Sequence, residues 1–490
     1  MLQPEAVNAL LLRHLSEHGL LPKNPEDMSW IIGNSKLGGR GMFATRDIEQ
    51  GELIYVDAPL VVGPRCYDKY LPMCITCYKS DCPLFPCERG CGLPVCSNEC
   101  EDNWKHAEIE CEYLRSWKPK CGSMWSMELL QAVVPIRALA LGTEQRNLVN
   151  ALECHPRKSR ELELLKRNIE YEINGEDEKL MLRVCQVLDT GAFETAALVE
   201  EKMSISLRGL YPLGALQNHC CTPNTRHHFD RRQYLYTRAA FPIKKGEELT
   251  MTYTDLIWDT GMRKQYLKMS KHFDCYCERC SDRTEFGTHL SALRCANIKC
   301  FGNMFANEPL KPESSWTCED CEQKVSGRQV KAIRSGLASI VKETLYKAPR
   351  EILEFVEGEL AILVPATSSM MMDMKFRIVS YFGRADGLSW RDLSDAELRT
   401  KTKYCEELVH LLDNLGCGDC QKKGLILYEW YCTNVEIERR NCRDKDPDST
   451  LEQPDSRDYG SNSFILQKAV DILRDDIAAP DDLSLIKTAD

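Results

Sequence analysis

The cysteines of this chain fall into closely spaced groups, and this spacing constrains the fold more than any other feature of the sequence. The chain has 26 cysteines in 490 residues. Clustered cysteines indicate either disulfides in an exported protein or zinc sites in a reducing compartment. The first residues, MLQPEAVNALLLRHLSEHGL, contain Glu5, Arg13 and Glu17 and have the apolar spacing of a helix, which does not fit an export signal. We therefore expect zinc sites in a cytoplasmic or nuclear protein.

The longest cysteine block lies between residues 74 and 111. Seven of its cysteines and one histidine have the spacing of zinc ligands, namely Cys74, Cys77, Cys87, Cys91, Cys96, Cys100, His106 and Cys111. Zinc binds four soft or borderline ligands in a tetrahedron, so the block supplies two complete sites. The stretch has few large apolar side chains, and metal would have to replace the missing core. A further cysteine, Cys82, could take the place of Cys87 as a ligand.

Two more cysteine groups follow towards the C-terminus. Cys275, Cys277 and Cys280 form a CxCx2C motif, which supplies three ligands and needs a fourth from elsewhere in the sequence. The last group has the paired spacing of a zinc ribbon and consists of Cys295, Cys300, Cys318 and Cys321. The sequence thus predicts about four zinc ions.

Charge and length limit the partners of this chain. Its net charge of −11 and pI of about 5.6 argue against direct binding of nucleic acid, whereas a basic protein that presents lysines would fit better. No apolar run approaches the ~18 residues of a membrane span, so we expect no membrane association. With 490 residues the chain needs several cores. We expect a monomer.

Three motifs in the middle of the chain stand in a diagnostic order. Residues 218–224 read NHCCTPN, residues 246–253 read GEELTMTY, and the CxCx2C motif follows. Upstream, residues 30–60 combine short β-branched runs with the loop KLGGRGMFA, which indicates a hairpin-rich β unit. Together these motifs resemble a SET methyltransferase domain with its post-SET zinc site. The block at residues 74–111, with VCSNEC and WKH, resembles a MYND finger, and its insertion inside SET identifies the chain as a member of the SET and MYND family.

The resemblance implies an S-adenosylmethionine-dependent protein-lysine N-methyltransferase that acts on histone or non-histone lysines in transcriptional or signalling regulation. It implies that the cofactor is bound by Gly39, Arg40, Gly41, Asn218, His219, Tyr253 and Phe273. Tyr253 stands in the place of the catalytic tyrosine, while Phe193 and Lys271 would line the channel for the substrate lysine. A buried tyrosine hydroxyl suits the chemistry, because methyl transfer needs polar groups that position the reacting atoms.

The resemblance also implies how the zinc ligands are grouped. Within the MYND finger, Cys74, Cys77, Cys96 and Cys100 would share one zinc, and Cys87, Cys91, His106 and Cys111 the other. Cys221 would join Cys275, Cys277 and Cys280. The zinc ribbon is an addition to the three-zinc members of the family and indicates a divergent four-zinc branch. MYND fingers in several families bind proline-rich peptides, so a proline-rich partner is a further hypothesis.

The predicted fold is α+β and multidomain. We expect an N-terminal helix (1–27), the first half of SET (28–65), the MYND finger (66–115), a helical insertion (116–188), the second half of SET (189–270), the post-SET zinc site (271–285), the zinc ribbon (290–325) and an all-α, TPR-like C-terminal domain (326–490). Residues 443–463 are rich in Asp, Ser, Arg and Pro and are predicted to be disordered.

Three departures from the family pattern leave a second function open. Gly191, Cys220 and Lys271 stand where relatives usually carry Asn, Ser and a second channel tyrosine, respectively. A cation at Lys271 would either oppose an incoming ammonium or lower its pKa. The alternative function is therefore a MYND-directed adaptor or corepressor with weak or no methyl transfer, and a third is a structural zinc scaffold.

Overall fold

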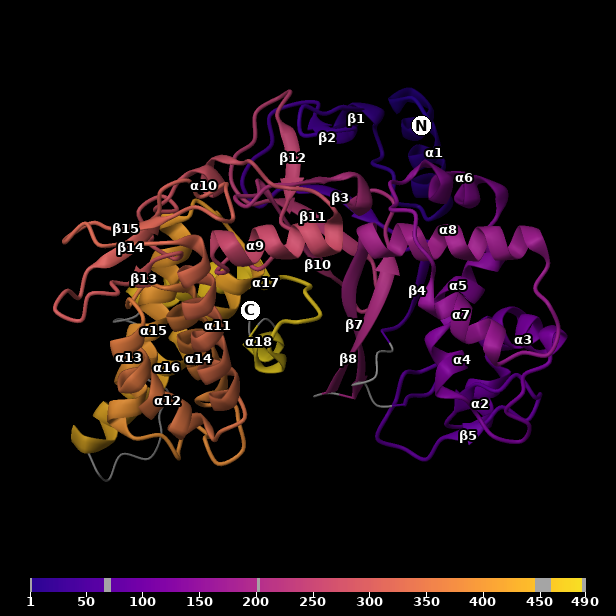
Figure 1. Ribbon diagram of the computed structural model, residues 1–490. Helices are drawn as coiled ribbons and strands as arrows, with labels where there is room; N and C mark the ends of the chain where they lie inside the picture. Colours follow the sequence, from indigo (N-terminus) through magenta and orange to yellow (C-terminus); the bar gives the residue numbers. More distant parts are fainter. Residues whose placement is uncertain (1, 66–71, 201–202, 446–459, 487–490) are drawn as a thin grey trace.

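The computed structural model describes residues 2–65, 72–200, 203–445 and 460–486 (Figure 1). Helices and several small sheets alternate along the chain, so the predicted α+β, multidomain fold is confirmed. The first helix, α1 (Pro4–Glu17), buries Val7, Leu11 and Leu15 against the opening strand and a helix of the insertion. Among the described residues no helix is long and apolar enough to cross a membrane.

The β-rich core consists of three small sheets built from both of the segments that resemble the halves of a SET domain. One has the order β1 (Trp30–Asn34), β2 (Arg40–Ala44), β12 (Glu248–Met251) and β9 (Asn218–His219). The second joins β10 (Thr225–Phe229), β11 (Leu235–Ala239) and β3 (Leu53–Asp57), and the third joins β4 (Val61–Pro64), β8 (Met203–Leu210) and β7 (Ala192–Glu200). Because β9 lies parallel to β12 and β12 lies antiparallel to β2, segments far apart in sequence meet in the first sheet.

The zinc-rich part and the helical insertion share one apolar core. The zinc-rich part contains β5 (Phe85–Pro86), β6 (Pro94–Val95), α2 (Asn98–Asp102), a π-helical turn (His106–Glu110) and α3 (Cys111–Trp117). The insertion contains α4 (Met127–Gln131), α5 (Val133–Arg137), α6 (Thr143–Ala151), α7 (Arg160–Arg167) and α8 (Gly175–Gly191). The long helix α8 then leads directly into β7, and Figure 1 shows it lying horizontally in the right half of the molecule.

After the core, α9 (Thr260–Tyr266) continues into a π-helical turn (Leu267–Lys271), and α10 (Glu278–Ser281) carries the last cysteine of the post-SET motif. A four-stranded sheet follows, made of β13 (Leu293–Arg294), β14 (Asn303–Ala306), β15 (Trp316–Cys318) and β16 (Lys324–Val325). Its apolar side chains belong to the same core as the C-terminal helices. The predicted zinc ribbon is therefore packed against the helical domain.

The C-terminal domain is entirely helical in the described residues. Its helices are α11 (Gly327–Thr344), α12 (Pro349–Glu357), α13 (Glu359–Leu363), α14 (Ser369–Tyr381), α15 (Asp395–Asn414), α16 (Gln421–Lys445), α17 (Gly460–Leu473) and α18 (Asp481–Ile486). Helix α15 begins directly after Ser394, which forms a capping box with Glu397. Of the segment predicted to be disordered, residues 446–459 lie outside the described residues.

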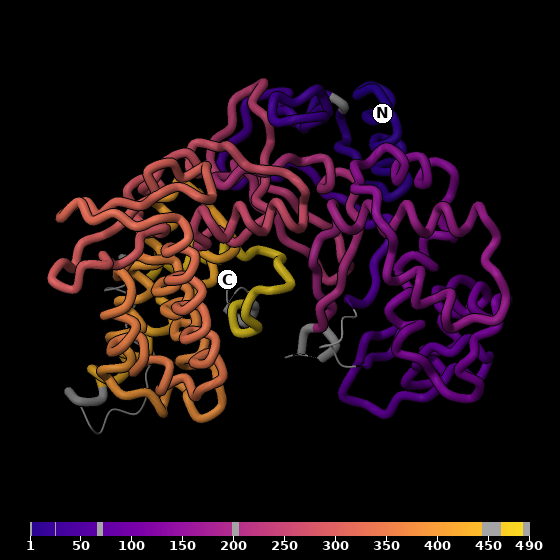
Figure 2. The backbone as a smooth tube through the Cα atoms, in the orientation of Figure 1, coloured from indigo at the N-terminus to yellow at the C-terminus, as the bar shows by residue number. Residues whose placement is uncertain are grey.

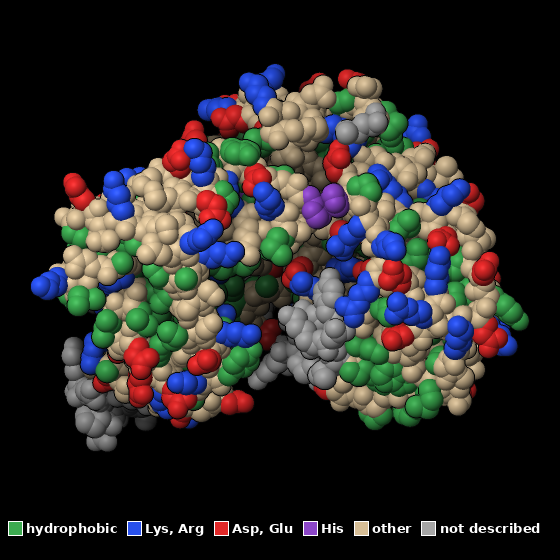
Figure 3. All heavy atoms as spheres, in the orientation of Figure 1, with side chains coloured by type: hydrophobic (Ala, Val, Ile, Leu, Met, Phe, Trp, Pro, Cys, Tyr) green, Lys and Arg blue, Asp and Glu red, His purple; other side chains and the backbone are tan. Residues whose placement is uncertain are grey.

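The end of the chain returns to the β core. The backbone N–H of Ile477 donates to the carbonyl oxygen of Phe229 at 2.8 Å, and Arg226 donates to the carbonyls of Ile472 and Asp471. Figure 2 shows this last segment between the helical bundle and the strands. Figure 3 shows the molecular surface hollowed between the C-terminal helices and the half that contains the insertion.

Candidate functional site

The first sheet brings the glycine loop next to the NHCC motif. The side-chain amide of Asn218 donates to the carbonyl oxygen of Arg40 at 2.9 Å and to Oε1 of Glu248 at 2.7 Å. At Gly41 a Cβ atom would lie only 2.2 Å from Oε1 of Glu248, so the Glu248 carboxylate occupies the space that a side chain at position 41 would take. Gly39 has φ +60°, which favours glycine.

Arg40 presents unused hydrogen-bond donors inside the protein. Its side chain is buried, and one Nη2 hydrogen bond reaches the carbonyl oxygen of Ala151. Among the described residues, Nε and Nη1 of Arg40 have no hydrogen-bond partner. Nη2 also lies 3.4 Å from Oε1 of the exposed Glu153. The two buried donors without a partner fit a further anionic group, such as the carboxylate of S-adenosylmethionine. The donor set at the glycine loop thus fits this cofactor.

Three aromatic rings from separate segments meet beside the loop. The ring centroids of His219 and Tyr253 are 5.2 Å apart, those of His219 and Phe273 5.9 Å, and those of Tyr253 and Phe273 6.3 Å. The backbone N–H of Tyr253 donates to Nδ1 of His219 at 3.0 Å, so the ring proton of the neutral histidine lies on Nε2. Burial lowers the pKa of His219 to about 4, which keeps it neutral near pH 7.

A cavity of about 360 Å³ lies on the other side of Tyr253. The predicted channel residues Phe193 and Lys271 line it together with Tyr253. Its wall also contains residues that the sequence analysis did not single out, among them Trp258, Tyr266 and His227. Burial lowers the pKa of His227 to about 4, so this ring is neutral near pH 7.

Two polar groups inside this cavity have defined partners. The hydroxyl of Tyr253 donates to the carbonyl oxygen of Gln217, which leaves its own oxygen free to accept a hydrogen bond. Burial raises the pKa of Tyr253, so the hydroxyl keeps its proton. The Nζ atom of Lys271 donates to the carbonyl oxygen of Thr190 at 2.6 Å and lies 5.5 Å from the centroid of the Tyr253 ring.

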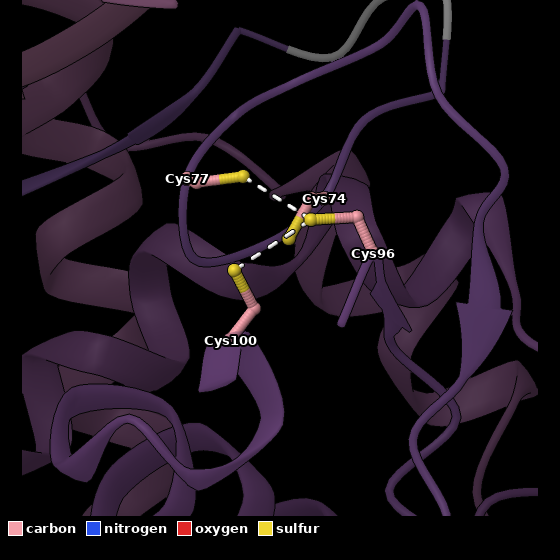
Figure 4. Close-up of side chains that lie close together, drawn as sticks. All are labelled: Cys74, Cys77, Cys96 and Cys100. Carbon is pink, nitrogen blue, oxygen red and sulfur yellow. Dashed lines mark hydrogen bonds between the residues drawn. The ribbon is translucent and has the colours of Figure 1, made fainter. Parts of the chain in front are cut away.

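Four groups of side chains are arranged to hold metal ions among the described residues. They consist of Cys74, Cys77, Cys96 and Cys100; Cys87, Cys91, His106 and Cys111; Cys221, Cys275, Cys277 and Cys280; and Cys295, Cys300, Cys318 and Cys321. Within each group all ligand atoms lie within 4.8 Å of one another. Figure 4 shows the sulfurs of the first group pointing towards a common centre. Four thiolates, or three thiolates and an imidazole, are typical of structural zinc.

The four groups are those that the family resemblance implies. Cys87 is a member of the second group, while Cys82 belongs to none of them in the described part of the chain. Behind the second group, Nδ1 of His106 lies 3.7 Å from Oε1 of the buried Glu110, and this carboxylate accepts from Nη2 of Arg137 at 2.9 Å and from Nε of Arg137 at 3.5 Å. A carboxylate behind a metal-binding histidine orients its ring.

Two of the missed cavity residues, Trp258 and Tyr266, come from the segment directly after the GEELTMTY motif, whereas His227 lies on β10. Trp258 precedes α9, and Tyr266 ends it. The ring centroids of Trp258 and Tyr266 are 5.5 Å apart in an edge-on arrangement. Their only signal in the sequence is the aromatic spacing after Tyr253, which is equally typical of a protein core.

Comparison with known proteins identifies the family of the core and of the whole chain. A model of the SET domain matches residues 39–254. SET domain-containing protein SmydA-8, isoform A, from Drosophila melanogaster is 31% identical over 436 residues, which cover 87% of this chain and 92% of that protein. Histone-lysine N-methyltransferase ASHR1 from Arabidopsis thaliana is 26% identical over 64% of this chain and 68% of its own length. Histone-lysine N-methyltransferase SMYD3 from Homo sapiens is 26% identical over 49% of this chain and 59% of its own length.

Proposed function

Because the chain belongs to the SET and MYND family, we propose that it transfers methyl groups from S-adenosylmethionine to lysine side chains of proteins. The observation that carries this proposal is the Tyr253 hydroxyl, held by Gln217 at the wall of a cavity large enough for a lysine side chain. The cofactors are S-adenosylmethionine and about four zinc ions. We assign cofactor binding to Gly39, Arg40, Gly41, Asn218, His219 and Phe273.

The residues of the site account for the chemistry. When bound, S-adenosylmethionine supplies an electrophilic methyl group. Because the Tyr253 hydroxyl donates to Gln217, its oxygen can accept an N–H of the acceptor amine and aim the nitrogen lone pair at the methyl group. The acceptor must lose its ammonium proton before transfer. Phe193 and Trp258 line the cavity with apolar surface and restrict the water that surrounds the amine.

Calorimetric titration and a labelled peptide library test this proposal against the alternatives. S-adenosylmethionine is expected to bind the zinc-loaded full chain, and label from the cofactor is expected to appear on a subset of lysine peptides. Binding without transfer to any peptide, histone or cell-extract protein would favour the adaptor. The absence of any cofactor binding would leave only the zinc scaffold.

Lys271 gives the proposed activity an expected pH dependence. Burial lowers the pKa of Lys271, while Glu194 and Asp189 act in the opposite direction. Below its pKa this ammonium lowers the pKa of an acceptor amine in the same cavity, because two like charges repel. Replacing Lys271 with Met should therefore move the acid limb of the kcat profile, which reports groups in the enzyme-substrate complex, to higher pH by about 1 unit.

The kcat profile is measured on one acceptor peptide over about 4 pH units, from roughly pH 6 to 10. Tyr253 and His227 do not titrate near neutral pH, since burial raises the pKa of the former and lowers that of the latter to about 4. Lys268→Met is the matched control, because that ammonium is exposed and lies outside the cavity. An acid limb that stays in place in Lys271→Met would refute the charge effect.

A proline-rich peptide is the proposed partner of the MYND finger. The finger exposes two aromatic side chains, Trp104 at 59% and Phe85 at 55%. Exposed aromatic rings are the surfaces on which proline-rich segments dock. Replacing Trp104 with Ala should weaken binding of such a peptide about tenfold, since a central aromatic anchor contributes more than ~1 kcal/mol.

Fluorescence anisotropy with a labelled proline-rich peptide measures this effect. The control is Tyr171→Ala, because Tyr171 is equally exposed at 58% but lies in the helical insertion. Equal affinities of the two variants would exclude Trp104 from the binding surface.

A further inference from the structure

A group of three charged side chains lies behind the post-SET cysteines and takes no part in the chemistry proposed above. Arg263 on α9, Arg279 on α10 and Glu285 have fully buried side chains. Oε2 of Glu285 accepts from Nη1 of Arg263 at 2.7 Å and from Nε of Arg279 at 2.9 Å. A buried ion pair is weak evidence for a contribution to stability, so the contacts that these three side chains make with their surroundings matter more for their role.

On one side this charged group contacts the sulfurs of the zinc site. Nε of Arg263 lies 3.2 Å from Sγ of Cys221, and Nη2 lies 3.6 Å from Sγ of Cys280. Four thiolates around Zn²⁺ carry a net charge of about −2, which a buried guanidinium would partly neutralise through N–H donors. Nε2 of His219, which carries the ring proton, reaches the same Cys221 sulfur at 3.2 Å.

On the other side the same guanidinium groups fix the wall of the lysine cavity. The carbonyl oxygen of Trp258 accepts from Nη1 of Arg263 at 2.5 Å and from Nη2 of Arg279 at 3.1 Å. Trp258 lines the cavity beside Tyr253, and it also lines a second cavity of about 930 Å³ between α9, the zinc ribbon and α11. Oε1 of Glu285 accepts from the N–H of Thr260, the first residue of α9.

We propose that Arg263 is a positioning residue that couples the post-SET zinc site to the substrate cavity, with one guanidinium holding both the zinc-binding sulfurs and the backbone of Trp258. Loss of the forked set of N–H donors on Arg263 loosens the cysteine cluster and, at the same time, shifts the cavity wall. A purely structural ion pair would lack this joint effect. The inference deepens the proposed methyltransferase function, because the wall it controls is the one against which the acceptor lysine would lie.

Arg263→Lys in the full chain tests the coupling, because it keeps the charge and loses the fork. Outer contacts of metal ligands typically contribute 10- to 100-fold in metal affinity, so zinc release to a chelator should accelerate at least about tenfold. With cobalt in place of zinc in the post-SET site, the thiolate-to-metal absorption band should shift. KM for an acceptor peptide should rise about tenfold, with a smaller change in kcat.

The position of Trp258 is followed separately with 5-fluorotryptophan and ¹⁹F NMR, where Trp258→Phe assigns its resonance. This resonance should move in Arg263→Lys and on removal of zinc from the unmodified chain. Zinc release and the Trp258 resonance are both measured without methyl transfer. A protein that transfers no methyl groups would therefore refute the proposed function but leave the coupling testable. Arg334→Lys is the control, since Arg334 pairs with Asp259 next to Trp258 without a contact to sulfur, and its zinc release should be unchanged.

If Arg263→Lys does not fold, Glu285→Gln serves instead, because it keeps the shape of the group and removes the charge that holds both arginines. Faster zinc release with a shifted Trp258 resonance supports the coupling. Faster zinc release with an unmoved resonance, or unchanged zinc release, overturns it.

Discussion

Replacing Tyr253 with Phe is expected to lower kcat for methyl transfer by about 100-fold or more, because a positioned polar group typically contributes 10²- to 10⁴-fold. The ring stays in place, so its contacts with His219 and Phe273 are preserved. Only the oxygen that orients the acceptor amine is lost. Binding of S-adenosylmethionine should therefore change little. Initial rates of transfer to an acceptor peptide, with calorimetry for the cofactor, measure both quantities.

Tyr236→Phe is the matched control for this variant. Tyr236 lies on β11, stacks on His228 at 5.1 Å and is outside the cavity, so its loss of a hydroxyl should leave the rate unchanged. A Tyr253→Phe enzyme that retains the rate of the unmodified chain would remove Tyr253 from the chemistry.

The second large effect is expected for Cys221→Ala. Cys221 is the last residue of the NHCC segment and lies two residues after β9, while its three cluster partners lie in the post-SET segment, with the sulfur of Cys280 3.5 Å away. Three remaining thiolates cannot complete a tetrahedral zinc site. We expect one zinc fewer per chain and a free energy of unfolding lower by about 4 kcal/mol or more, the range typical of metal loss. Cofactor binding should also fail, because His219 and Phe273 flank this site.

Zinc released on denaturation and thermal unfolding of the folded chain measure these effects. Cys220→Ser is the control, since Cys220 is adjacent in sequence but lies outside the four-sulfur group. A Cys221→Ala protein that holds as much zinc as the unmodified chain would contradict the assignment of Cys221.

The cysteine spacing predicts more of this fold than the apolar pattern does. Zinc needs four ligands in a fixed geometry, so closely spaced pairs define a site without reference to the rest of the chain. The position of Cys221, 54 residues before Cys275, could not follow from spacing and came from the resemblance to SET domains. The same holds for the meeting of Arg40, Asn218 and Glu248, which depends on how β2, β9 and β12 pair.

The sequence could not predict which charged side chains are buried. Arg263 stands in the helical run GMRKQY, where charged residues normally face solvent. It is buried because the post-SET cysteines lie on one side of it and Glu285 on the other. Trp258 likewise becomes a cavity residue only through the fold around it. No local motif marks Arg263 or Trp258, because the residues that surround them in the fold lie elsewhere in the sequence.

The central claim is that this chain methylates lysine in proteins, and mass spectrometry of the product tests it most directly. The zinc-loaded full chain is incubated with S-adenosylmethionine carrying a trideuterated methyl group and with a mixture of histones and cell extract. The account predicts trideuteromethyl groups on lysine Nζ atoms of particular proteins, and their loss with Tyr253→Phe. Deuterated methyl groups on residues other than lysine, or on none while the cofactor binds, would contradict it.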